Sequence, residues 1–176
     1  SPQPPIGYVL SMEGADPSVG PWQVETWRAH GLRIVSLVHY GFNLYSYGTG
    51  TVGGLTPAGR DLLRELDRQG MILDVTHLSE PAFWEALDLF QGPVLATHNN
   101  CRALVPGDRQ FSDEQIRKLI ARGGVIGVAM DDWMLYPDWK PEPGSNELVS
   151  LEDVANQIDH ICQVAGNAGH AAIASE

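Results

Sequence analysis

Residues 71–98, MILDVTHLSEPAFWEALDLFQGPVLATH, contain the unit of sequence that decides the fold. A short apolar run ends in His77, Ser79 and Pro81 mark the start of an amphipathic segment, and a second apolar run ends in His98. Near-continuous apolar runs of about 5–7 residues are typical of strands that are buried on both faces of a parallel sheet. This stretch therefore predicts a strand, a crossing helix and a second strand, with a histidine at the carboxyl end of each strand.

The same unit recurs on both sides of residues 71–98. Four more apolar runs have the same length and texture, at Gly7–Glu13, Arg33–His39, Gly124–Met130 and His170–Glu176. Helix starts are indicated between the runs, because Thr56 precedes Pro57 and because Ser112 and Ser150 are each followed three residues later by a side chain that can complete a capping box. Regular alternation of strands and helices predicts a parallel α/β fold.

The number of strands relates this α/β fold to the barrels. Six strands are predicted, whereas a closed (β/α)8 barrel of the TIM type has eight strands and usually about 250 residues. An open sheet is the alternative, but the chain stops at Glu176, directly after an apolar run and without the helix that such a run requires. We therefore predict a single barrel domain over residues 1–176 that covers about six of the eight strands and is incomplete at both ends.

Composition and charge argue against several classes of function. The chain has a formal net charge of −11, a pI near 4.8 and no cluster of Lys and Arg, so a nucleic acid is not expected as a partner. No apolar run approaches the roughly 20 residues of a membrane span. Cys101 and Cys162 form no CxxC pair, which favours a reducing compartment and a cytoplasmic protein. A secreted or anchored form stays as the alternative, since the ends are expected to be incomplete.

The ionisable residues at the ends of the apolar runs are the main functional signal. Four predicted strand ends carry a side chain that can bind a metal: Glu13, His39, His77 and His98. These ends form the functional face of a parallel barrel, and imidazole and carboxylate are common ligands of hydrolytic zinc sites. The pattern by itself predicts a metal site with these four residues as candidate ligands. The other histidines, His30, His160 and His170, are predicted to be structural.

Short motifs at these strand ends resemble a known family. They are Met-Glu-Gly (12–14), Val-His (38–39), Asp-Val-Thr-His (74–77) and Ala-Thr-His (96–98), with Gly-Leu-Thr-Pro-Ala-Gly (54–59) before a helix. Their order and spacing, through Ile-Asp-His-Ile (158–161), are similar to those of the renal (membrane) dipeptidases, a family of zinc metallopeptidases. Each motif is weak alone, but together they cover nearly the whole chain.

The resemblance implies an activity and a role for each site residue. The enzyme would hydrolyse a dipeptide substrate by a metal-activated hydroxide at a centre of two zinc ions. Glu13 would bridge the two ions, and His77 and His98 would complete the protein ligands of the second ion. His39 would contact the scissile carbonyl or its oxyanion instead of a metal, which makes it the candidate catalytic residue. Arg109 would bind the substrate carboxylate, for which its planar pair of donors is suited.

Three departures from the family pattern keep other functions open. The chain has no His-x-Asp pair for the first zinc, and Glu176 stands where the acid/base motif Asp-x-Asp-Gly of the family begins. Both departures fit missing ends, whereas residues 129–133, Ala-Met-Asp-Asp-Trp, replace the Asn and aromatic residues that the family usually has there. The alternatives are the same barrel and metal acting on another amide or on a lactone, and a catalytically silent paralogue with a binding role. The assembly is also open, and a homodimer is one candidate.

Overall fold

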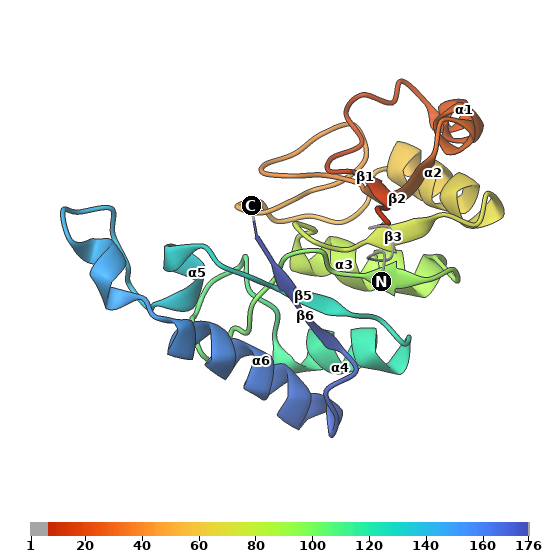
Figure 1. Ribbon diagram of the computed structural model, residues 1–176. Coiled ribbons are helices and arrows are strands. Elements are labelled where there is room, and N and C mark those ends of the chain that lie inside the picture. The colour runs from red at the N-terminus through yellow and green to blue at the C-terminus, as the bar shows by residue number, and fades with distance from the viewer. Residues whose placement is uncertain (1–6, 176) are drawn as a thin grey trace.

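The computed structural model describes residues 7–175, in which short strands alternate with helices (Figure 1). The strands are β1 (Leu10–Met12), β2 (Leu32–Ser36), β3 (Ile72–Asp74), β4 (Val94–Leu95), β5 (Ile126–Ala129) and β6 (Ala171–Ala174). The helices are α1 (Val24–Ala29), α2 (Pro57–Arg68), α3 (Glu80–Leu89), α4 (Asp113–Ala121), α5 (Asp132–Leu135) and α6 (Leu151–Ala165), with the 3-10 turns η1 (Pro21–Gln23) and η2 (Ser145–Leu148). Glu176, the end of the sixth predicted run, lies outside the described residues.

The strands pair in the order in which they occur in the chain, and every pairing between them is parallel. β1, β2, β3 and β4 form one sheet, and β5 pairs with β6. A parallel bridge between Ala96 and Ile126 connects the end of β4 to β5. This order is that of consecutive units of a (β/α)8 barrel, and it confirms the predicted α/β class with six of the eight strands.

The helices begin at the side chains that the sequence indicated. Thr56 and Ser79 accept hydrogen bonds from backbone N–H groups three residues further on, at 3.0 and 3.3 Å. Ser112 and Ser150 form capping boxes at the starts of α4 and α6. Each cap satisfies a backbone donor that a helix start would otherwise leave unpaired, which is worth about 1 kcal/mol.

The core lies between the strands and the inner faces of the helices. Its largest fully buried side chains include Tyr45, Leu62, Leu63, Leu66, Met71, Leu73, Phe83 and Phe90. Arg122 at the end of α4 fastens the end of α3 to this core, because its guanidinium donates to the carbonyls of Leu87, Phe90 and Gly92 at 2.8–3.1 Å. Helices also pack on one another, α2 on α3 and α4 on α6.

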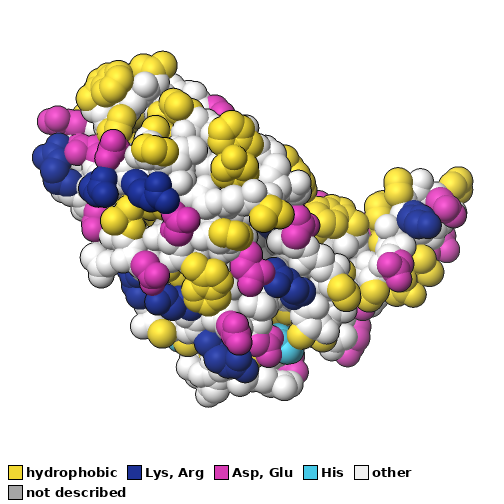
Figure 2. Space-filling view, turned by 180° about the vertical axis from the view of Figure 1, so that it is seen from behind, with side chains coloured by type: hydrophobic (Ala, Val, Ile, Leu, Met, Phe, Trp, Pro, Cys, Tyr) yellow, Lys and Arg dark blue, Asp and Glu magenta, His cyan; other side chains and the backbone are white. Residues whose placement is uncertain are grey.

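The two outer strands of the array and one connection are the most exposed parts of the fold. Leu10 of β1 is 48% exposed and Ile173 of β6 is 65% exposed, because each strand has a partner on one side only among residues 7–175. The connection between α5 and α6 projects from the body as an arm, at the left of Figure 1 and the right of Figure 2. On the face shown in Figure 2, basic side chains lie among acidic ones.

The two cysteines differ in burial, which predicts a difference in reactivity. Cys101 is fully buried and its thiol donates to the carbonyl of Gln157, whereas Cys162 is half-buried. Burial, with a smaller effect from Asp113, raises the pKa of Cys101 to about 12. Because the thiolate is the nucleophile, we expect iodoacetamide at about pH 8 to alkylate Cys162 and leave Cys101 unmodified. Peptide mass spectrometry measures this, and a denatured sample in which both thiols react is the control. Alkylation of Cys101 before Cys162 in the folded protein would contradict the burial of Cys101.

Candidate metal centre

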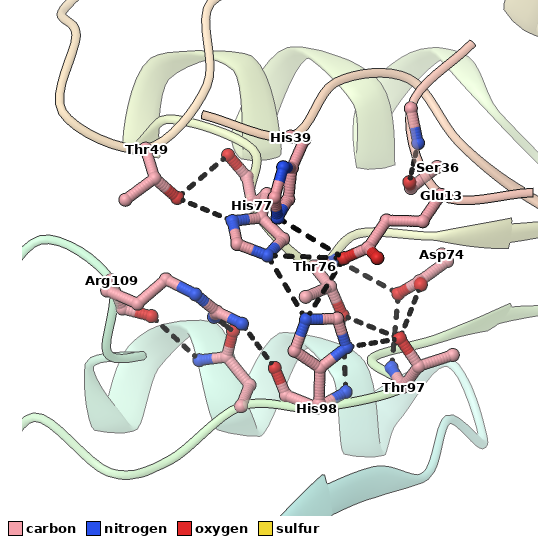
Figure 3. A network of polar contacts seen from close by, with 12 residues as sticks. Glu13, Ser36, His39, Thr49, Asp74, Thr76, His77, Thr97, His98 and Arg109 are labelled. Carbon is pink, nitrogen blue, oxygen red and sulfur yellow. Dashed lines mark hydrogen bonds and ion pairs between the residues drawn. The ribbon is translucent and has the colours of Figure 1, made fainter. Parts of the chain in front are cut away.

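Three side chains converge where β1, β3 and β4 end (Figure 3). The Nε2 atoms of His77 and His98 lie 3.1 Å apart. Oε1 of Glu13 lies 3.3 Å from Nε2 of His77 and 3.2 Å from Nε2 of His98. In the part of the chain that the structure describes, these three residues are the one group of His, Cys, Asp and Glu side chains that could hold a metal ion.

The separations of these three atoms fit a bound cation. Ligand atoms about 2.0–2.2 Å from one zinc ion, in tetrahedral or octahedral arrangement, lie roughly 3 Å from each other. Two imidazole nitrogens and a carboxylate oxygen at this distance need either hydrogen-bonding protons or a positive charge between them. The donor set is therefore suited to a divalent ion such as zinc, with nitrogen and oxygen ligands.

The environment of His77 keeps its imidazole neutral, as a metal ligand must be. The residue is 4% exposed, and burial lowers the pKa of His77 to about 2, with the positive charge of Arg109 as the next cause. The backbone of His77 has a φ of 67°, a left-handed conformation that costs a non-glycine residue of the order of 1–2 kcal/mol. This strain is borne at the residue that turns its ring toward Glu13 and His98.

Close packing of β5 positions the segment that carries His98. A Cβ atom on Gly127 would lie 2.0 Å from the backbone oxygen of Thr97, so a larger residue would push the two strands apart. Glycine here lets the N–H of Gly127 donate to Ala96 at 2.9 Å and its carbonyl accept from Asn99 at 2.7 Å. His98 lies between these two backbone contacts.

His39 lies beside this group but outside it. Its Nε2 is 3.8 Å from Oε1 of Glu13, its side chain is 53% exposed, and its ring meets that of His77 edge to face with centroids 4.3 Å apart. The pattern alone had made His39 a fourth candidate ligand, and in the structure it is not one of the three converging residues. An exposed imidazole at the rim of a metal group can donate a hydrogen bond to a substrate, which is the role that the resemblance implied.

Arg109 reaches the same place from the loop after His98. It is 4% exposed, and its guanidinium donates to the side-chain oxygen of Asn99 and, at 2.7 Å, to the backbone oxygen of His98. Arg109 also lines a cavity of about 70 Å³ together with His39, Tyr40, His77, His98, Asp131, Trp133 and Met134. The expected substrate-binding cation is thus both a support for the ligand segment and part of a cavity wall.

The remaining histidines lie away from this group. Nε2 of His160 is 2.8 Å from Oδ1 of Asp113, and Nδ1 of His170 is 2.8 Å from the backbone oxygen of Gly124. His30 is exposed at the end of α1. None of the three belongs to the metal-competent group among residues 7–175.

Three polar residues that were not predicted surround the ligands. Thr49 contacts Nδ1 of His77, and Thr97 contacts both Nδ1 of His98 and the carboxylate of Asp74 (Figure 3). Asp74 and Thr97 stand three and one residues before a ligand, within the motifs Asp-Val-Thr-His and Ala-Thr-His. That proximity was a usable signal. Thr49 is 28 residues from His77, and no local pattern indicates their contact.

Comparisons with known proteins agree on one family. The model of the membrane dipeptidases (peptidase family M19) matches residues 3–176. The chain is 35% identical over 143 residues to dipeptidase tcpJ of Claviceps purpurea, an alignment that covers 79% of this chain and 31% of the relative. It is 30% identical over 165 residues to an uncharacterised protein from the PQQ-III 3' region of Acinetobacter calcoaceticus, covering 89% of this chain and 52% of the relative.

Two solved structures match nearly all of this chain. The metallopeptidase dipeptidase AC of family M19 has a TM-score of 0.84 at 27% identity, covering 96% of this chain and 51% of that one. A metallopeptidase from Rhodobacter sphaeroides, solved with a phosphinate mimic of the dipeptide L-Ala-D-Ala, has a TM-score of 0.81 at 28% identity, covering 96% and 49%. This chain spans about half the length of the Acinetobacter relative and of both structures.

The lowered pKa of His77 predicts how stability depends on pH in the metal-free protein. Unfolded His77 takes up a proton below about pH 6.5, whereas the folded residue stays neutral down to about pH 2. The unfolded state then binds more protons, so the free energy of unfolding should fall as the pH drops below about 6.5, by up to about 1.4 kcal/mol per pH unit from this group.

His77→Asn is the matched variant for this measurement, because Asn tolerates a left-handed φ and does not titrate. Urea unfolding at several pH values should give a shallower loss of stability in the variant than in the wild type. Equal slopes would mean that His77 titrates normally in the folded protein.

Proposed function

Since this chain belongs to the membrane dipeptidase family, peptidase family M19, we propose that its protein is a metal-dependent dipeptidase that hydrolyses dipeptides at a binuclear zinc centre. The observation that carries the proposal is the convergence of Glu13, His77 and His98 within 3.1–3.3 Å at three strand ends. The family and the printed names of the dipeptidase relatives support the same substrate class.

Glu13 is suited to the bridging role because its carboxylate lies between the two histidines on one side and a cavity on the other. One oxygen faces the two ligand histidines. The residue also lines a cavity of about 470 Å³ together with Ser11, Met12, Asp74, Thr97, His98, Ile173, Ala174 and Ser175. Its side chain is 43% exposed, so the carboxylate can contact an ion in this cavity as well as an ion held by the histidines. A second ion would be held on that side, with further ligands from outside residues 7–175.

The chemistry of the proposed reaction divides between the metal and the chain. Divalent ions held here would lower the pKa of a water molecule toward about 7 and polarise the scissile carbonyl. His39, at the rim, would donate a hydrogen bond to the oxygen of that carbonyl, on which negative charge develops. Glu13 would offset the positive charge of the ions, which an otherwise neutral pair of imidazoles cannot do.

Arg109 would select substrates with a terminal carboxylate. It lines the cavity of about 70 Å³ next to His39, and this small volume suits a short substrate. Asp131 lines the same cavity, and its carboxylate would pair with the amino group of a zwitterionic dipeptide. The phosphinate dipeptide mimic bound to the Rhodobacter sphaeroides structure supports a small peptide substrate for a protein of this fold.

One observation favours a second candidate substrate. The terminal nitrogens of Arg109 already donate to Asn99 and to the backbone of His98, which would suffice for a purely supporting residue. The Asp131–Trp133 segment, which departs from the family pattern, lines the cavity beside it. The same barrel and metal would then act on another amide or on a lactone.

We propose a reducing compartment, such as the cytoplasm, as the location of the protein. Both cysteines are unpaired in the structure, in keeping with a reducing compartment such as the cytoplasm. Of the helices within residues 7–175, none has the length and apolar character to cross a bilayer.

Substitution of the three converging residues tests the metal site. We expect His77→Ala or His98→Ala to reduce bound zinc and abolish dipeptide hydrolysis in the complete protein. Glu13→Gln should reduce the occupancy of both zinc ions, because a bridging carboxylate is a ligand of each. Elemental analysis of purified variants measures this, with thermal unfolding to show that each variant folds.

His160→Ala, a histidine paired with Asp113 away from the site, is the matched control and should keep its metal. Unchanged zinc in both ligand variants would remove the metal site, and loss of one ion only in Glu13→Gln would argue against the bridge.

Replacement of Arg109 distinguishes the two candidate substrates. A hydrogen bond to a charged group contributes roughly 1.5–3 kcal/mol, so Arg109→Met should lower kcat/KM for unblocked dipeptides by about 10- to 150-fold and spare C-terminally amidated ones. Lysine should restore part of the activity, since it has the charge without the planar pair of donors. The ratio between the two substrates is the measurement, because damage to the His98 segment would affect both equally. An unchanged ratio would make Arg109 a structural residue.

A further inference from the structure

We propose that Asp74 and Thr97 are positioning residues of the metal centre: they hold His98 in the tautomer that carries its proton on Nδ1, so that Nε2 presents its lone pair to the metal. Thr49 acts in the same way on His77. The inference rests on the proposed metal site and extends it to residues that do not themselves bind the metal.

A chain of hydrogen bonds leads from Asp74 through the half-buried Thr97 to His98 (Figure 3). Asp74 is 3% exposed. Its Oδ1 accepts from the backbone N–H groups of Thr76 at 3.0 Å and Thr97 at 3.1 Å, and its Oδ2 accepts from the hydroxyl of Thr97 at 2.6 Å. An ionised carboxylate has no proton to donate, so the single hydroxyl proton of Thr97 points toward Asp74.

The direction of this first hydrogen bond decides the second. Oγ1 of Thr97 lies 2.9 Å from Nδ1 of His98. Since the hydroxyl proton is engaged with Asp74, the oxygen can only accept from Nδ1, which must therefore carry a hydrogen. A neutral imidazole has one such hydrogen, so the lone pair of His98 is on Nε2, the atom 3.2 Å from Glu13.

The contact of Thr49 with His77 favours the same tautomer, with the hydrogen on Nδ1 of His77. Oγ1 of Thr49 lies 2.9 Å from Nδ1 of His77 and 3.4 Å from the backbone oxygen of the same residue. If the hydroxyl donates to that carbonyl, Nδ1 of His77 is the donor to Thr49. Because the bond of 3.4 Å is long and no carboxylate stands behind it, removal of Thr49 should have the smaller effect.

Substitution of Asp74 by Asn should move the imidazole proton of His98 from Nδ1 to Nε2. Two backbone N–H groups hold Oδ1, so the amide oxygen of Asn would stay there and its NH2 group would replace Oδ2. That group would donate to Thr97, whose hydroxyl would then donate to Nδ1 of His98. The proton of His98 would move to Nε2 and block the metal position.

The test measures Zn²⁺ affinity, by competition with a chelator, in the complete protein and its variants. Loss of a residue that orients a ligand typically costs about 10- to 100-fold in metal affinity, and we expect Asp74→Asn to lie in this range. Thr97→Val should cost less, because both tautomers are then accessible, and Thr97→Ser should bind as the wild type does.

The double variant Asp74→Asn/Thr97→Val is the decisive comparison. Without the Thr97 hydroxyl, the amide of Asn at position 74 has no group through which to change the tautomer of His98. The double variant should therefore bind Zn²⁺ as Thr97→Val does and more tightly than Asp74→Asn. Thr49→Val should lower the Zn²⁺ affinity less than Asp74→Asn does. Its control is Thr51→Val, because the hydroxyl of Thr51 is shared between the carbonyls of Gly41 and Gly48 and, within residues 7–175, contacts neither His77 nor His98. It should leave the affinity unchanged.

A direct readout separates this inference from the metal proposal. Nitrogen-15 spectra of the metal-free protein should show His98 protonated on Nδ1, and on Nε2 in Asp74→Asn. Protonation of wild-type His98 on Nε2, or additive losses of affinity in the double variant, would overturn the inference. A wild-type protein that binds no Zn²⁺ but shows the Nδ1 tautomer would overturn the proposed function and leave the tautomer assignment standing.

Discussion

The parallel register of the strands is the constraint on which the candidate metal centre depends. Asp74 of β3 pairs with Leu95 of β4, and each is followed three residues later by a ligand, His77 or His98. The two imidazoles therefore reach the same level above the sheet. Because side chains alternate between the two faces of a strand, a shift of one residue would turn a ligand away from its neighbours. Glu13 reaches the same level from the end of β1, two strands away from β3 and three from β4.

The convergence that this register imposes has an electrostatic cost. Two imidazole nitrogens and a carboxylate oxygen face each other at 3.1–3.3 Å, and the two imidazoles are almost fully buried. Such an arrangement needs either hydrogen-bonding protons or a cation between the three atoms, and a cation satisfies all three at once. The nearby positive charge of Arg109 also lowers the pKa of His77 and keeps its imidazole neutral, which is the form that can bind a metal ion.

The surroundings of the ligands combine rigid and accessible parts. Behind the histidines, Thr49 and Asp74 are buried and Thr97 is half-buried, and hydrogen bonds fix each of them to its neighbours. His39 and the Asp131–Trp133 segment lie at the rim, exposed to the cavity in which a substrate would be held. The chain carries six of the strands of the TIM-barrel fold of its family, and the exposed outer strands β1 and β6 mark the two sides of this array.

The amino-acid sequence by itself determined the elements, their order and the four candidate ligands at the strand ends. Apolar runs that end in Glu13, His77 and His98 specify buried strands, and capping residues such as Thr56 and Ser79 specify where helices begin, because both signals act over a few neighbouring residues. Only the tertiary structure decided what lies behind each ligand. The pairing of Thr49 with His77, 28 residues apart, and the burial of Arg109 against His98 depend on how separate loops pack, and packing distances are not encoded in any local pattern. The place of His39 outside the group of three was implied by the family resemblance but not by the strand-end pattern.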